Sequence, residues 1–103
     1  MKILLVITED WYFISHRKYL AKQAKELNNT VVLLTNVTNH KKEIEKIGIK
    51  LIDWPLIRNS KNFNNEISAI KFLIDVVRIE KPTIIHSVGL KPIVYTSLVS
   101  IIT

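Results

Sequence analysis

The chain has 103 residues and is 48% hydrophobic, which is enough for the core of one domain. It contains no cysteine, which excludes a disulfide framework and a thiolate metal site, and no apolar stretch reaches the ~18 to 20 residues of a transmembrane helix. The net charge of +6 is scattered. Such a balance is compatible with nucleic acid, an anionic membrane or a phosphorylated ligand, and no nucleic-acid motif accompanies it.

Continuous apolar runs rich in β-branched residues alternate with segments of helical periodicity. In chain order they predict a strand at Lys2–Thr8, a helix at Ser15–Leu27, a strand at Thr30–Asn36, a helix at Asn39–Ile47 ended by Gly48, a strand at Lys50–Leu56, a helix from Asn64 or Asn65 to Glu80, a strand at Thr83–Val88 and a helix that begins at Pro92. This alternation is typical of a parallel sheet covered on both faces. We therefore predict a Rossmann-like, doubly wound α/β sheet in three layers, with strand order 3-2-1-4.

Helical spacing also predicts which side chains face the core. The inward residues are Phe13, Leu20, Ala24 and Leu27 in the first long helix, and Ile67, Ile70, Ile74 and Val77 in the helix that ends at Glu80. On the opposite side of the first helix, Lys18, Lys22 and Lys25 predict a solvated face, with weak attraction to anionic lipid as the functional alternative. The uncharged segment Ile93–Thr103 predicts a buried helix. We therefore expect the chain to be part of a larger protein and to self-associate when alone.

A doubly wound sheet places its ligand at the carboxyl ends of the strands, here between the first and fourth. The segments Thr8–Ser15 and Ser87–Lys91 are predicted to flank this crevice, and helix amides after each of them add partial positive charge. The polar groups of the two segments are Glu9, Asp10, Ser15, His16, His86 and Lys91. His16, expected at the edge of the core, is a candidate base or hydrogen-bond partner.

Each of these groups also has a purely structural interpretation. Asp10 and Ser15 are residue types that commonly cap a helix, and the aromatic run Trp11–Phe13 is suited to covering the top of the sheet. His86 can be a hydrogen-bonded core residue, and Lys91 a solvated one. None of the histidines has the spacing of a metal site.

A phosphoacceptor receiver domain is a further alternative. Such a domain needs acids after the first and third strands and a Lys-Pro pair, and this chain has Glu9, Asp10, Asp53 and Lys91-Pro92. However, Lys91-Pro92 follows the fourth predicted strand instead of a fifth, and no glycine turn follows Asp53. The predicted topology therefore argues against a receiver.

Three stretches, TEDWYFISHR, RNSKN and IIHSVGLKPIVY, together resemble the N-terminal domain of family 4 glycosyltransferases with the GT-B fold, of the bacterial type that assembles surface polysaccharides. The resemblance implies that residues 1–103 are an incomplete acceptor-binding domain, and that a C-terminal domain absent here binds the nucleotide-sugar donor, usually a UDP-sugar. It implies retaining transfer to a lipid-linked saccharide acceptor at the cytoplasmic face of the membrane. No cofactor besides the donor substrate is implied.

The resemblance also implies a set of substrate-binding residues. They are Glu9, Asp10, Ser15, His16, Arg58, Asn62, His86 and Lys91, with Tyr95 nearby. Two departures from the family pattern matter: the first loop lacks glycine, and Val88 stands where many members have a second histidine. We therefore assign no catalytic residue and expect this chain alone to be inactive. A non-catalytic module that binds a ligand or partner is the alternative.

Overall fold

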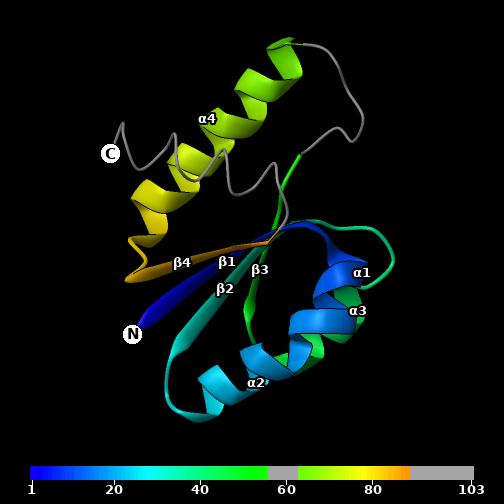
Figure 1. Ribbon diagram of the computed structural model, residues 1–103, viewed down its shortest axis with the longest axis vertical. Helices are drawn as coiled ribbons and strands as arrows, with labels where there is room; N and C mark the ends of the chain where they lie inside the picture. The colour runs from blue at the N-terminus through cyan, green and yellow to red at the C-terminus, as the bar shows by residue number, and fades with distance from the viewer. Residues whose placement is uncertain (56–62, 89–103) are drawn as a thin grey trace.

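The computed structural model describes residues 1–55 and 63–88, which include a sheet of four parallel strands (Figure 1). The strands are β1 (Lys2–Glu9), β2 (Thr30–Asn36), β3 (Lys50–Asp53) and β4 (Ile84–Val88). They lie in the order β3-β2-β1-β4, which confirms the predicted topology. In the centre of the sheet, Leu5 of β1 pairs with Leu33 of β2 on one side and with His86 of β4 on the other.

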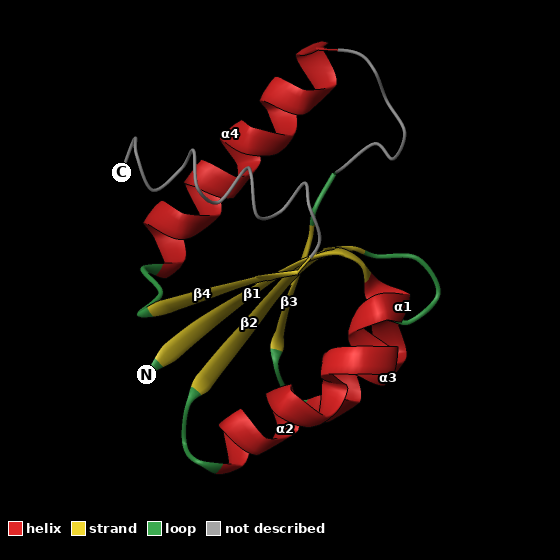
Figure 2. Ribbon diagram, viewed as in Figure 1, coloured by secondary structure: helices red, strands yellow, loops and turns green. Residues whose placement is uncertain are grey.

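Helices cover both faces of this sheet (Figure 2). On one face, α1 (Asp10–Tyr12) continues through a π-helical segment, η1 (Phe13–Arg17), into α2 (Lys18–Glu26), and α3 (Lys41–Ile47) lies beside them. On the other face lies α4 (Phe63–Glu80). Among the described residues, no helix is long and apolar enough to cross a bilayer.

Alternating side chains of the two central strands form two separate cores, as the period of two in a strand requires. Leu4 and Val6 of β1 pack with Leu73 of α4, whereas Leu5 and Ile7 pack with Phe13 of η1. Because both sets are apolar, the strands read as continuous hydrophobic runs, which is why the sequence predicted them well.

The first helical unit differs from its prediction at both its start and its inward face. It begins at Asp10 instead of Ser15. Ala21 is buried, whereas Leu20 and Leu27, both predicted inward, are 47% and 76% exposed. The π-helical segment explains the shift at Leu20, because its wider turn rotates the following residues relative to a regular helix.

The inward face of α4 also differs from its prediction. From Ile67 onward, Ala69 and Leu73 are fully buried, while Ile67 is exposed and the other three predicted inward residues are partly buried. The buried Trp54 accounts for this choice, because its indole Nε1 donates a hydrogen bond to the Ala69 carbonyl oxygen at 3.2 Å. The small alanine side chain lets the bulky indole approach the helix backbone.

The remaining boundaries shift by a few residues. β3 ends at Asp53 instead of Leu56, β4 begins at Ile84 instead of Thr83, and α3 begins at Lys41 instead of Asn39. Gly48 ends α3, as predicted, and it does so in the left-handed conformation, with φ of 84°. The predicted helix from Pro92, including Ile93–Thr103, lies outside the described residues.

Glu80, the last residue of α4, is buried at the amino ends of the strands, with a side chain that is 5% exposed. Its carboxylate contacts the ammonium of Lys50 at 2.6 Å and that of Lys2 at 2.9 Å. The hydrogen bonds from Lys50 and Lys2 lower the pKa of the Glu80 carboxyl, against the effect of burial. This cluster ties β1, β3 and α4 together and was not predicted from the sequence.

Candidate functional site

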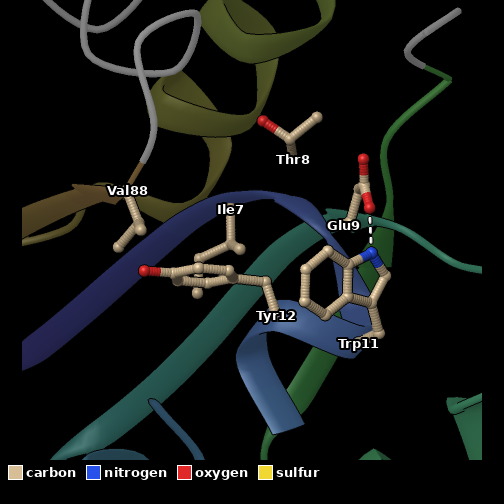
Figure 3. Close-up of a pocket in the computed structure, with 6 residues that line it drawn as sticks. All are labelled: Ile7, Thr8, Glu9, Trp11, Tyr12 and Val88. Carbon is tan, nitrogen blue, oxygen red and sulfur yellow. Dashed lines mark hydrogen bonds between the residues drawn. The ribbon is translucent and has the colours of Figure 1, made fainter. Parts of the chain in front are cut away.

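A hollow of about 200 Å³ opens at the carboxyl ends of β1 and β4, where the doubly wound topology predicts a ligand (Figure 3). In the described part of the chain its lining consists of Ile7, Thr8, Glu9, Trp11, Tyr12 and Val88. Ile7 and Val88 are paired across the two strands and form an apolar patch. The site therefore lies between the segments that the sequence predicted to flank it.

Two aromatic residues give this hollow its shape. Trp11 is 46% exposed. Its ring meets that of Tyr12 edge-on, with centroids 5.8 Å apart. The indole Nε1 of Trp11 donates a hydrogen bond to the Glu9 carboxylate, which places Glu9 at the rim (Figure 3). The arrangement combines aromatic faces with one carboxylate and the Thr8 hydroxyl.

Asp10 follows Glu9 in the chain but is fully buried and is not among the residues that line this hollow. Its carboxylate accepts hydrogen bonds from the Thr38 amide at 2.8 Å, the Thr38 hydroxyl at 2.7 Å and the His40 amide at 3.2 Å. Burial by itself would raise the pKa of the Asp10 carboxyl, but these hydrogen bonds outweigh it and lower the pKa. Asp10 thereby joins the loop after β2 to the start of the first helix.

The helix-cap interpretation of Asp10 and Ser15 is wrong. Asp10 is the first residue of the helix, no side-chain cap forms at Glu9 before it, and Ser15 lies inside the π-helical segment. Of the three aromatics predicted to cover the sheet, Phe13 alone is fully buried, while Trp11 and Tyr12 line the hollow. The aromatic run is thus divided between packing and the site.

His16 is exposed and does not lie at the edge of the core as predicted. Its ring stacks on Tyr12, with centroids 4.3 Å apart and an interplanar angle of 14°. Ser15 and His16 line a second hollow of about 250 Å³, together with residues of α2. His16 therefore reaches the first hollow only through Tyr12, whose ring it supports.

The structure places His86 on the α2 face of the sheet instead of at its carboxyl edge. It lines an apolar hollow of about 170 Å³ that also contains Leu5 and Leu20. Within residues 1–55 and 63–88, the buried Nε2 of His86 has no hydrogen-bond partner, so it is not the hydrogen-bonded core residue of the structural alternative. Arg58, Asn62, Lys91 and Tyr95 lie outside the described residues.

The predicted lysine face is engaged in packing between helices. Lys18 pairs with Glu43 of α3 at 3.1 Å, and its hydrogen bond lowers the pKa of the Glu43 carboxyl. Lys25 donates to the Ile47 carbonyl oxygen at 3.0 Å, at the C-terminus of α3. The prediction of a purely solvated face is therefore wrong for Lys18 and Lys25.

The acids of the receiver alternative have separate partners. Glu9 bonds to Trp11, Asp10 bonds to Thr38, and Asp53 accepts a hydrogen bond from the Val37 amide at 3.1 Å. Within the part of the chain that the structure describes, no three acidic or histidine side chains are grouped to hold a metal ion.

Thr38 and His40, which bind Asp10 from positions 28 and 30 residues later in the chain, were not predicted from the sequence. Both follow the predicted end of β2, so their place after a strand was the only available signal. Ile7, which lines the hollow from β1, was also missed, whereas Thr8 belongs to the segment that the sequence predicted to flank the crevice.

Comparison with known proteins agrees with this architecture. A family model described as glycosyl transferase 4-like matches residues 2–102. A crystal structure of a glycosyltransferase from Rickettsia africae ESF-5 is similar to this chain with a TM-score of 0.78 at 20% sequence identity. The similarity covers 99% of this chain and 27% of that one, so this chain spans about a quarter of that glycosyltransferase. No curated protein matches the chain.

Proposed function

Because this chain belongs to the glycosyl transferase 4-like family, we propose that it is the acceptor-binding part of a retaining glycosyltransferase with the GT-B fold. In this proposal a second domain binds a nucleotide-sugar donor, such as a UDP-sugar, and the first domain holds a saccharide acceptor. The acceptor is lipid-linked and the product is a cell-surface polysaccharide, which places the enzyme at the cytoplasmic face of the membrane.

The observation that supports this proposal best is the hollow beside Trp11 and Tyr12. Aromatic rings offer flat apolar surfaces, and the faces of a sugar ring carry C–H groups that pack against them. Thr8 and Glu9 add a hydroxyl and a carboxylate that can bind sugar hydroxyls. At about 200 Å³ the hollow is smaller than the roughly 300 Å³ at which drug-sized pockets begin. It therefore suits one ring of a longer acceptor.

The residues around the hollow have different roles in binding. Trp11 and Tyr12 contact the sugar, His16 holds the Tyr12 ring in place by stacking, and Asp10 fixes the start of the helix by its hydrogen bonds to the loop after β2. The other predicted contacts (Ser15, Arg58, Asn62, His86 and Lys91) stay predictions. No residue is assigned as a catalytic base, and the chemical step belongs to the complete enzyme.

The test measures saccharide binding by this chain, using NMR titration with a panel of methyl glycosides. We expect millimolar binding with shifts centred on Trp11 and Tyr12, lost at least tenfold in Trp11→Ala. The matched control is Tyr19→Ala, because Tyr19 is an aromatic residue that is 73% exposed and does not line this hollow. Equal binding by Trp11→Ala and the parent would contradict the proposed site.

A second measurement addresses the whole enzyme. The complete polypeptide that carries this domain is incubated with UDP-sugars and lipid-linked acceptors, beside this chain alone. We expect transfer by the complete polypeptide only. Saccharide binding without transfer by the complete polypeptide would instead indicate a non-catalytic binding module.

A further inference from the structure

The segment that carries the aromatic walls of the hollow needs support from the rest of the fold. α1 is three residues long, which is less than one helical turn, and it passes directly into the π-helical segment η1. A π-helical turn is rare and is often found at functional sites. The orientation of Trp11 and Tyr12, which lie in α1 and line the hollow, therefore depends on contacts with neighbouring elements.

One neighbouring unit, the loop after β2 together with α3, contacts this segment at both of its ends (Figure 2). At the start, the Thr38 amide donates to Oδ2 of Asp10 at 2.8 Å, and the Thr38 hydroxyl donates to Oδ1 of Asp10 at 2.7 Å. At the end, Lys18 pairs with Glu43 of α3 at 3.1 Å. Residues 10–18 are thus held at both ends by residues 38–43.

The two anchors differ in how firmly they hold. The Lys18 and Glu43 side chains are 34% and 43% exposed, so solvent and salt weaken their ion pair. Asp10 is fully buried, and Thr38 contacts both oxygens of its carboxylate, which fixes the plane of this group as well as its position. Because Asp10 directly precedes Trp11, a shift of the Asp10 backbone moves the aromatic walls of the hollow.

Resting on the proposed function, we propose that Thr38 is a positioning residue for the saccharide hollow. Thr38 is not among the residues that line the hollow. Through Asp10 it orients the backbone that presents Trp11 and Tyr12 to the sugar. Walls that are already in place need no ordering when the sugar binds, so loss of the Thr38 contact weakens binding without removing any group that touches the sugar.

The decisive variant is Thr38→Val, which removes the hydroxyl with little change in shape and keeps the amide contact. NMR titrations with the methyl glycosides of glucose, galactose and mannose give dissociation constants, and the Trp11 indole N–H signal reports occupancy of the hollow. We expect Thr38→Val to bind the sugar that the parent recognises roughly fivefold more weakly. Thr38→Ser keeps the hydroxyl and should bind as the parent does. If the valine methyl group disrupts the fold, Thr38→Ala removes the hydroxyl without adding bulk and takes its place.

Thr35→Val is the matched control. Thr35 lies in β2 and is fully buried, and its hydroxyl has no hydrogen-bond partner within residues 1–55 and 63–88. The substitution removes the same group from a neighbouring part of the chain without loosening Asp10. Saccharide binding should therefore stay unchanged.

A second readout separates positioning from stability. The order parameter of the Trp11 indole N–H, measured by NMR relaxation without ligand, should fall in Thr38→Val and stay at the parent value in Thr38→Ser and Thr35→Val. A residue that only stabilises the fold would lower the melting temperature. It would leave the order parameter and the dissociation constant of the folded chain unchanged.

Three outcomes would overturn the inference. Equal binding by Thr38→Val and the parent would leave the saccharide site standing and remove the positioning role of Thr38. Binding by Thr38→Ser as weak as that by Thr38→Val would show that the hydroxyl is not the cause. If no glycoside shifts the Trp11 and Tyr12 signals of the parent, the proposed saccharide site fails together with the inference.

Discussion

Two buried carboxylates, Asp10 and Glu80, lie at opposite ends of the same sheet and are held by different kinds of partner. Asp10, at the carboxyl end, accepts three hydrogen bonds from neutral donors of the Thr38–His40 loop. Glu80, at the amino end, is paired with the ammonium groups of Lys2 and Lys50. Amides and hydroxyls act at short range and in fixed directions, whereas ammonium groups on flexible stems act through charge that solvent and salt screen.

This difference matches what each end of the sheet has to do. The carboxyl end carries the hollow, so its backbone must be held in one geometry, and directional hydrogen bonds achieve that. The amino end only has to keep α4, β1 and β3 together. Partly exposed lysines suffice there, with Lys50 58% exposed.

The largest expected effect is that of Asp10→Ala. This change leaves two amides and a hydroxyl of the Thr38–His40 loop without their acceptor, so we expect a loss of about 3 kcal/mol in the free energy of unfolding. Urea denaturation measures it. Asp53→Ala is the control, because Asp53 is exposed and accepts a single bond from Val37; it should cost less than about 1 kcal/mol. Similar losses in both variants would contradict the anchoring role of Asp10.

Glu80→Gln should cost less than Asp10→Ala, about 1 to 2 kcal/mol. The glutamine amide carries no charge, so the ion pairs with Lys2 and Lys50 are lost. Solvent already weakens those pairs because the lysines are partly exposed. Repeating the urea denaturation in 1 M NaCl sharpens the comparison. The cost of Glu80→Gln should shrink in salt, whereas that of Asp10→Ala should not. An equal response of the two costs to salt would show that the two ends are held by the same forces.

Acid should remove part of the same stabilisation without any substitution. The pKa of each carboxyl is lower in the folded chain than in the unfolded one. Each therefore stabilises the fold fully above its ordinary pKa of about 4, and this stabilisation is lost as the pH falls through the lower folded value. Unfolding curves between pH 7 and pH 2.5 should show a smaller acid loss in Glu80→Gln than in the parent. Parallel curves for the two proteins would contradict this prediction.

Gly48→Ala tests a contact between helices away from both acids. An L-residue is strained at a φ of 84°, and the added methyl group would displace the Lys25 ammonium from the Ile47 carbonyl oxygen. We expect a loss of about 1 kcal/mol in thermal or urea unfolding. Lys25→Ala should lose only the hydrogen bond and cost less. If Lys25→Ala lowers the stability as much as Gly48→Ala does, the whole loss in Gly48→Ala comes from the hydrogen bond between Lys25 and Ile47, and backbone strain contributes nothing.

The smallest expected effect on stability is that of Trp11→Ala, beside Asp10 in the chain. Trp11 is 46% exposed, so its removal should change the free energy of unfolding by no more than about 0.5 kcal/mol. Its effect on saccharide binding should be large. A stability loss comparable to that of Asp10→Ala would mean that Trp11 supports the fold and that the hollow is a by-product of packing.

Sequence reasoning was reliable where a structural signal is local. The four strands were found because each is a continuous apolar run, and their order followed from the handedness of the connections. It was less reliable for the faces of helices. The extra residue in the turn at Phe13–Arg17 moved Ala21 into the place predicted for Leu20, and nothing in the apolar pattern announces a π-helical turn.

The candidate site shows the same division. That the site lies after β1 followed from the doubly wound topology, and the side-chain chemistry of residues 9–16 marked this segment as unusual. The role of each residue within the segment could not be predicted from the sequence. Asp10 and Glu9 are adjacent acids, yet one is buried against a loop 28 residues away and the other faces the hollow.

The sequence by itself determined the α/β class, the strand order and the edge of the sheet at which the hollow opens, because hydrophobic periodicity and chain handedness are properties of short segments. Only the tertiary structure decided which acid anchors a loop and which lines the hollow, which histidine supports an aromatic wall, and how Glu80 gathers two lysines. Those outcomes depend on groups brought together from distant positions in the chain. The contacts between these groups stabilise the protein only once the chain has folded and water has been excluded between them.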